Sequence, residues 1–172
     1  DDELAERFRS IRAHGKGGAK YDIVRVGLNA RLDTLQAAIL LAKLDVFDDE
    51  LASRRRLAEG YQRRLGSVVA TPASSNSSDS AWAQYTLVVD ERDEVQKILG
   101  QSGIPTAIYY PKPMHLQTAY AGFGDGAGSL PVSEFLADHV LSLPMHPYLS
   151  DEHIGQICDA VKAAVSGAQG HA

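Results

Sequence analysis

The chain has 172 residues, is 44% hydrophobic and 23% charged, and carries a formal net charge of -5. These values are typical of a globular protein with one domain, or one domain and a piece of another, and the negative charge argues against nucleic acid as the main partner. No apolar run approaches the roughly 18 residues of a membrane span, and the acidic start DDELAERFRS lacks the pattern of a signal peptide. We therefore expect a cytoplasmic protein without a membrane partner.

The first predicted element is an amphipathic helix over residues 1–13, which is ended by His14 and Gly15. Its apolar face is made by Leu4, Phe8 and Ile11. Because the chain opens within this helix, we expect a fragment whose first residues belong to a preceding domain. A glycine-rich loop follows over 15–31.

A long helix is predicted from Thr34 to Leu65, with a break or kink near Asp48 and Asp49. Asp33 is placed to cap its first turn. The residues of its later part that are expected to face inward are Leu51, Leu57, Tyr61 and Leu65.

The second half of the chain mixes strands and helices. A polar loop over 71–80, expected to be exposed and mobile, precedes a strand at 81–89 with aromatic and β-branched residues. Asp90 caps a predicted helix over 91–100, and a second strand follows at 104–110. Strand, helix and strand within so short a stretch predict a compact α+β unit.

A long irregular segment, KPMHLQTAYAGFGDGAGSLPVS, leads to the last elements. Segments of this length without regular structure are usually functional or disordered. A helix from about Val132 to His139 and a short strand at 141–145 follow. Ser150 is expected to cap a final helix that ends near Val165.

Three common types of site find no support in the sequence. GKGG at 15–18 lacks the spacing of a phosphate loop, and GFGDGAG at 122–128 neither follows a strand nor opens a helix, as a dinucleotide-binding loop would. The six histidines form no pair at metal-ligand spacing with a carboxylate or cysteine, so we expect no metal site. The single cysteine, Cys158, is expected to be a buried thiol.

Polar residues on loops are the remaining candidates for a site. An amide and an arginine, Asn29 and Arg31, precede the long helix, whose N-terminus adds a partial positive charge, so they suit a phosphate or a carboxylate. Tyr109 and Tyr110, followed by Pro-x-Pro, form a stiff wall against which a sugar or a base can stack. Ordinary loop chemistry is the alternative for each.

The run GLNARLDTLQAAIL at 27–40 resembles the DegT/DnrJ/EryC1/StrS family of sugar aminotransferases. Blocks in the same order surround it: IRAHG, WAQYTLVV, GIPTAIYYPKPMHLQTAY and LSLPMHPYLSDEHI. The resemblance therefore covers nearly the whole chain, roughly residues 3–165.

This resemblance implies an α+β fold, the C-terminal small domain of a type I aminotransferase fold with a long connecting helix and a small, mainly antiparallel sheet flanked by helices. It implies pyridoxal 5'-phosphate as cofactor, glutamate and a nucleotide-linked keto sugar as substrates, a homodimer, and a role in cell-surface polysaccharide or amino-sugar biosynthesis. The implied divisions are the tail of the large cofactor domain with a dimer-crossing loop (1–33), the connecting helix (34–66), the small domain (67–166) and a frayed tail (167–172).

By the same resemblance, Asn29 binds the cofactor phosphate of the neighbouring subunit. Arg31 lies near the sugar, where it meets the carboxylate of a UDP-linked 3-keto hexuronic acid. The block at Tyr109 and Tyr110 usually reads His-Tyr-Pro and helps to hold the nucleotide-sugar; Tyr109 replaces the histidine here but can still stack and donate. His115 and His14 are further candidates for substrate contacts.

The Schiff-base lysine of the family lies upstream of its block matching IRAHG, with the aspartate that pairs with the pyridine nitrogen. None of the six lysines matches it: Lys16, Lys20, Lys43, Lys97, Lys112 and Lys162. We therefore expect the chain alone to be inactive. Two alternatives stay open, a non-catalytic dimerising or sugar-binding module and a sugar dehydratase of the same family, in which a histidine replaces the lysine.

Overall fold

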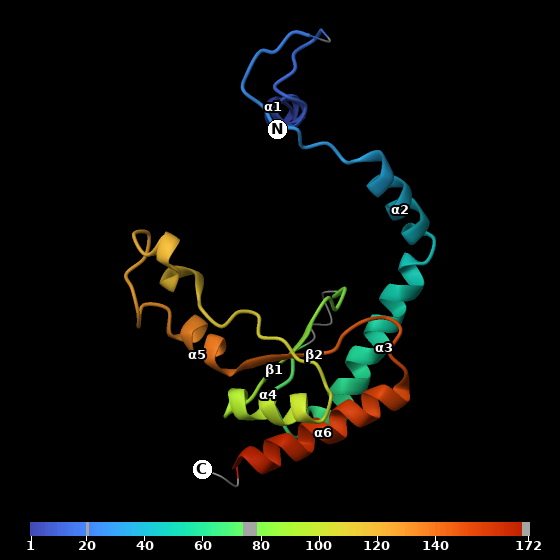
Figure 1. Ribbon diagram of the computed structural model, residues 1–172, viewed down its shortest axis with the longest axis vertical. Helices are drawn as coiled ribbons and strands as arrows, with labels where there is room; N and C mark the ends of the chain where they lie inside the picture. The colour runs from blue at the N-terminus through green and yellow to red at the C-terminus, as the bar shows by residue number, and fades with distance from the viewer. Residues whose placement is uncertain (20, 74–78, 170–172) are drawn as a thin grey trace. The chain divides into compact units, whose positions relative to one another are not determined.

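The computed structural model describes residues 1–19, 21–73 and 79–169. The chain divides into two compact units, Asp1–Phe47 and Asp48–Ala172, and each is described by itself (Figure 1). None of the helices in the described ranges is long and apolar enough to cross a bilayer.

The first unit begins with α1 (Asp2–Arg12). The Asp1 carboxylate accepts a hydrogen bond from the backbone N–H of Leu4 at 3.2 Å and caps the helix. His14 and Gly15 then take left-handed conformations, with φ of 64° and 75°, which ends the helix where the sequence predicted. A Cβ at Gly15 would lie 1.7 Å from the carbonyl oxygen of Arg25, so only glycine fits there.

The glycine-rich loop folds back along the end of α1. Its two arms pair at isolated antiparallel bridges, Ala13 with Asn29 and Lys16 with Ile23. The backbone N–H of His14 donates to the carbonyl of Leu28 at 2.9 Å. The residues that enter α2 are therefore held beside the residues that leave α1.

The helix predicted over 34–65 is two helices, α2 (Thr34–Leu44) and α3 (Phe47–Leu65). The Asp33 carboxylate accepts from the N–H of Leu35 at 2.8 Å, so the predicted cap is confirmed. The predicted break is confirmed, and it lies two to three residues before the expected place, at Asp45 and Val46. Asp48 and Asp49 lie in the first turn of α3, where carboxylates favour the positive end of the helix dipole, and so they start a helix instead of bending one.

The second unit has a small sheet. β1 (Tyr85–Val88) and β2 (Val140–Leu143) pair antiparallel, with Tyr85 opposite Leu143. Isolated bridges at Ala70 and Ala107 extend this sheet beyond β1 and β2 respectively. The strand predicted over 104–110 is therefore reduced to one bridge. Pro105 has no N–H to donate, and only Ala107 exchanges backbone hydrogen bonds with Ser142, at 2.8 and 3.1 Å.

One hydrophobic core joins the sheet to α3, α4 (Arg92–Gln101) and α6 (Asp151–Gln169), and α4 runs beside α6 (Figure 1). Each fully buried Leu or Ile contributes about 1.5–3 kcal/mol by leaving water. The largest side chains of the core that are fully buried are Tyr61, Tyr85, Leu57, Leu65, Leu87, Leu99, Leu141 and Ile154. Cys158 is also fully buried, as predicted.

Two helix ends differ from the prediction. Asp90 does not cap α4, because Glu91 occupies the cap position in a left-handed conformation with φ of 48° and without a capping side-chain bond. Helix α6 continues past Val165 to Gln169, so residues 167–169 of the predicted frayed tail are helical. Ser150 does cap α6, since its hydroxyl accepts from the N–H of His153 at 3.2 Å.

The helix predicted before β2 is confirmed as α5 (Pro131–His139), with Pro131 in its first turn. The irregular segment ahead of it contains only two short turns of 3-10 helix in the structure, η1 (Met114–Leu116) and η2 (Thr118–Tyr120). Lys20, residues 74–78 of the predicted polar loop and residues 170–172 of the predicted tail lie outside the described residues.

Candidate functional site

Three of the predicted site residues, His14, Asn29 and Arg31, belong to the first unit. The Ala13–Asn29 bridge and the hydrogen bond from His14 to Leu28 bring His14 and Asn29 onto neighbouring arms of the folded loop. Arg31 follows two residues later, ahead of the Asp33 cap of α2. Local backbone pairing therefore gathers these three residues where the chain enters a helix.

The side chains of Asn29 and Arg31 are exposed and have no hydrogen-bond partner in the described part of the chain. An amide N–H and a guanidinium fork donate to phosphate and carboxylate oxygens. This donor set suits an anionic group, either a phosphate or a carboxylate.

A second group of predicted residues lies on the second unit. The side chains of Tyr85 and Leu87 enter the core, so alternation along β1 directs Thr86 to the opposite face of the sheet. There the hydroxyls of Thr86 and Ser142 lie 2.8 Å apart. This face of the sheet carries the Thr86–Ser142 pair beside the apolar pair Val88 and Val140, and none of the four belongs to the main core cluster.

A cavity of about 340 Å³ lies beside this face, and Tyr109 lines it. Gln84 and Ser142 line the same cavity and were missed by the sequence analysis. The strand alternation in AWAQYTLVV could have found Gln84, because it has the same parity as the outward-facing Thr86. Ser142 required knowledge of the strand register, Thr86 opposite Ser142.

The two tyrosines of the predicted wall are in contact. Their ring centroids are 5.8 Å apart and meet edge to face, and Tyr110 is the more exposed, at 72%. The exposed ring of Tyr110 leaves a face free for stacking, whereas Tyr109 faces the cavity beside the sheet.

His115 is held inside the segment that follows. Its side chain is only 8% exposed, and its Nε2 lies 3.0 Å from the Glu134 carboxylate of α5. The backbone N–H of Gly128 and then the ring of His115 lower the pKa of Glu134. The substrate contact predicted for His115 stays a prediction, and little of its surface is available for one.

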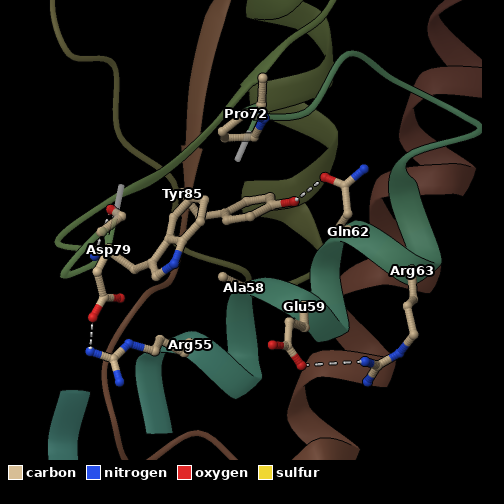
Figure 2. Close-up of a pocket in the computed structure, with 11 residues that line it drawn as sticks. Arg55, Ala58, Glu59, Gln62, Arg63, Pro72, Asp79 and Tyr85 are labelled. Atoms are coloured by element: carbon tan, nitrogen blue, oxygen red, sulfur yellow. Dashed lines mark hydrogen bonds and ion pairs between the residues drawn. The ribbon is translucent and has the colours of Figure 1, made fainter. Parts of the chain in front are cut away.

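A larger cavity, of about 690 Å³, lies between α3 and the start of β1 and contains none of the six predicted residues (Figure 2). Trp82 and Tyr85 form its aromatic side, and burial raises the pKa of Tyr85 to about 12. Its charged groups are already paired: Arg55 with Asp79 at 2.5 Å, and Arg63 with Glu59 at 3.8 Å. These pairs leave little charge for binding an ionic ligand.

The lysines whose positions are described do not form a buried site. Lys16, Lys43, Lys97 and Lys112 are exposed, and Lys162 is half-buried. Lys97 and Lys162 make ion pairs within their own helices, with Glu94 and Asp159. Lys20 lies outside the described residues.

Comparison with known proteins gives consistent matches. A UDP-2-acetamido-2-deoxy-3-oxo-D-glucuronate aminotransferase of Pseudomonas aeruginosa is 46% identical over 162 residues, which are 94% of this chain and 44% of the relative. A dTDP-3-amino-3,4,6-trideoxy-alpha-D-glucose transaminase of Streptomyces venezuelae is 38% identical over 164 residues, 94% of this chain and 43% of the relative. The crystal structure of a DegT DnrJ EryC1 StrS aminotransferase from Brucella abortus matches with a TM-score of 0.90 and 47% identity, and covers 96% of this chain and 44% of that one.

The chain thus spans less than half the length of the relatives it matches. Members of the matching family depend on pyridoxal 5'-phosphate. Residues 1–162 match the model of the DegT/DnrJ/EryC1/StrS aminotransferase family, and the mixed structure of helices and a small antiparallel sheet agrees with a part of its fold. The chain belongs to the DegT/DnrJ/EryC1/StrS aminotransferase family.

Proposed function

We propose that the chain is the C-terminal region of a pyridoxal 5'-phosphate-dependent aminotransferase that transfers an amino group from glutamate to a nucleotide-linked keto sugar. The observation that carries this proposal is a pair of exposed donors ahead of the capped helix α2 in a chain of this family, Asn29 and Arg31, whose side chains have no partner among the described residues. The division into the end of a large domain, a connecting helical region and a small domain is part of the proposal.

In this proposal Asn29 donates to the cofactor phosphate of the neighbouring subunit of a homodimer. The backbone bridge from Asn29 to Ala13 keeps the amide at the end of α1, so that it needs little reorganisation to bind. When bound, the cofactor supplies an electron sink for the transfer and carries the amino group between the two substrates.

Arg31 binds and orients the sugar. A guanidinium fork matches the two oxygens of a carboxylate, which favours a UDP-linked 3-keto hexuronic acid. The P. aeruginosa relative, named for an oxo-glucuronate, supports this class. The S. venezuelae relative is named for a neutral dTDP-linked sugar and supports the competing class, in which Arg31 meets a hydroxyl or a phosphate instead.

Tyr110 and Tyr109 hold the nucleotide-sugar in this proposal. The exposed Tyr110 ring stacks on the sugar or the base, and the hydroxyl of Tyr109 takes the place of the donor that a histidine supplies in relatives. His14 completes the proposed set as an exposed side chain near Asn29.

We propose that the Schiff-base lysine lies in the part of the family fold that this chain does not cover. In this proposal none of the six lysines here takes its role, and the 172 residues bind and orient but do not carry out the transfer alone. Where the full-length protein has a histidine at that position, the same binding residues would serve a dehydration instead.

An isotope-transfer experiment tests this function. The full-length protein is incubated with ¹⁵N-glutamate and a nucleotide-linked 3-keto sugar, and the sugar product is analysed by mass spectrometry. We expect the label in the sugar, with the UDP-linked uronic acid preferred over a neutral dTDP-linked sugar. Loss of water from the sugar without uptake of the label would replace transamination by dehydration. Binding of the sugar without any product would favour a non-catalytic module.

A further inference from the structure

The carboxylate of Glu134 contacts residues near both ends of the irregular segment before α5. Glu134 Oε1 lies 3.0 Å from Nε2 of His115 and accepts from the backbone N–H of Leu130 at 3.2 Å. The N–H of Gly128 donates to both Glu134 oxygens, at 2.9 Å each. Glu134 therefore closes a loop of residues that starts at His115 and ends at Leu130.

The residues between Tyr110 and His115 are conformationally restricted, so holding His115 in place also restricts Tyr110. Pro111 and Pro113 lie between Tyr110 and His115, and each fixes its own φ. The side-chain amide of Gln117 donates to the carbonyl of Lys112 at 3.2 Å and braces the same stretch. Fixing His115 therefore limits the positions that Tyr110 can take.

The contact between His115 and Glu134 is partly shielded from water. The side chain of His115 is 8% exposed and that of Glu134 is 25% exposed. A carboxylate that accepts several N–H groups in such a setting is held more firmly than a surface ion pair. The positive φ of Gly128, 85°, directs its N–H in a conformation that other residues rarely adopt.

We propose that Glu134, acting through His115, is a positioning residue for the nucleotide-sugar: it holds the segment that carries Tyr110 in its binding conformation without touching the substrate. This inference rests on the proposed function, because it assigns Tyr110 to the sugar nucleotide. It predicts an effect on sugar binding that leaves the reaction with glutamate unchanged.

The rival explanation is that Glu134 only stabilises the fold. A second rival is that His115 itself touches the substrate. Glu134→Ala, Glu134→Gln, His115→Phe and His115→Gln separate these explanations, because glutamine at position 115 keeps a donor for the carboxylate while phenylalanine does not. Asp138→Asn is the matched control, since Asp138 is an exposed carboxylate on the same helix without a partner among the described residues.

The first measurement needs no activity. Amide hydrogen exchange of the peptides that contain Gly128 and Leu130 is followed in the full-length protein. We expect exchange about tenfold faster in Glu134→Ala and unchanged exchange in Asp138→Asn, with peptides of β1 and α6 as internal references. Unchanged exchange in Glu134→Ala would overturn the role of Glu134 in holding the segment.

The second measurement compares the two substrates. In Glu134→Ala and His115→Phe we expect the KM for the keto sugar to rise about tenfold, with kcat and the glutamate half-reaction changed less than about twofold. His115→Gln should recover most of the affinity, and the double variant Glu134→Ala/His115→Phe should be no worse than either single change. If Glu134 only stabilised the fold, its loss would lower the rates of the glutamate and keto-sugar half-reactions by the same factor. That result would overturn the proposal.

Two outcomes separate this inference from the proposed function. Faster exchange with an unchanged KM shows that the segment does not position the sugar, and overturns the inference while the function stands. A wild-type enzyme that transfers no amino group to any keto sugar overturns the function, and with it the substrate role given to Glu134. A loss in His115→Phe much larger than in Glu134→Ala would make His115 itself the substrate contact.

Discussion

The phenol of Tyr61 donates a hydrogen bond to the carbonyl of Pro144 at 2.8 Å and so ties α3 to the residues that leave β2. The Tyr61 ring is fully buried, and burial raises the pKa of its hydroxyl well above the ordinary value. The hydroxyl is therefore a permanent donor between a helix and a strand that lie far apart in the sequence.

Tyr61→Phe should lower the free energy of unfolding by about 1–2 kcal/mol, because the Pro144 carbonyl loses its partner in a shielded place. Urea titration followed by circular dichroism measures this change. Tyr85→Phe is the matched control: its hydroxyl reaches Gln62 at a longer 3.3 Å, and we expect a smaller loss. Equal stability of Tyr61→Phe and wild type would show that the bond contributes nothing.

The contribution of Glu134 to stability should depend on pH. The N–H of Gly128 and the His115 ring lower its pKa in the folded state. A carboxyl with a lowered folded pKa stabilises the protein above its unfolded pKa, about 4.3, and this stabilisation is lost as the pH falls through the folded value. The stability difference between wild type and Glu134→Gln should therefore shrink below about pH 4.

Urea titrations at several pH values measure that difference, with Asp138→Asn as the control for the removal of a carboxylate from α5. A wild-type to Glu134→Gln difference that stays constant between neutral and acid pH would show that ionised Glu134 is not favoured by its contacts.

Arg31→Ala in the full-length enzyme should reduce catalytic efficiency selectively. Charge-assisted hydrogen bonds are worth about 1.5–3 kcal/mol each, with overlapping losses for a fork. We expect a fall of about 100-fold for substrates with a sugar carboxylate, and little change in the glutamate half-reaction. Arg31→Lys should recover only part of the lost catalytic efficiency, because an ammonium group cannot donate two parallel hydrogen bonds to one carboxylate. Asn29→Ala should instead weaken cofactor retention for every substrate.

Half-reaction rates with glutamate, a uronic sugar and a neutral sugar check this prediction. Equal losses on the uronic and the neutral sugar in Arg31→Ala would remove the carboxylate role and leave Arg31 as a general phosphate or dimer contact.

Mixed dimers test whether Asn29 acts across a subunit boundary. Subunits with Asn29→Ala are refolded with subunits in which the upstream lysine is replaced, so that each parent dimer is inactive or weak. If Asn29 serves the neighbouring cofactor, half of the randomly formed dimers contain one intact site, and about a quarter of wild-type activity should return. No recovery in dimers shown to be mixed would place Asn29 in the site of its own subunit.

Local signals predicted much of the fold. The Asp33 and Ser150 caps follow from short-range sequence, and helical periodicity identified Leu57, Tyr61 and Leu65 as core residues. The end of α1 at His14 and Gly15 was also visible, because glycine takes left-handed conformations readily.

The errors have tertiary causes. The predicted break between α2 and α3 was misplaced by two to three residues, because its true position at Asp45 and Val46 is marked by neither glycine nor proline. The strand propensity of residues 104–110 was real, but a strand needs a partner, and only Ala107 pairs with β2. The left-handed conformation of Glu91, at the start of α4, also could not be predicted from the sequence, because glutamate rarely adopts it.

Only part of the candidate site could be proposed from the sequence. Asn29, Arg31 and the two tyrosines stand out as polar or aromatic residues on loops. The place of Ser142 beside Tyr109 required the strand register, and the Glu134–His115 contact joins residues 19 apart through an irregular segment. Helical or strand periodicity in the sequence cannot predict a contact such as Glu134–His115, because one of its residues lies in an irregular segment.

The most direct test of the central claim is the pair of half-reactions of the full-length protein, followed by the absorbance of its cofactor. Glutamate should convert the bound pyridoxal form to the pyridoxamine form, and a UDP-linked 3-keto hexuronic acid should convert it back, whereas the 172-residue chain with added pyridoxal 5'-phosphate should show neither change. Full-length protein whose cofactor spectrum does not respond to glutamate or to the keto sugar would contradict the assignment. A stoichiometric adduct that borohydride traps on one lysine of the 172-residue chain would contradict the claim that the reactive lysine lies elsewhere.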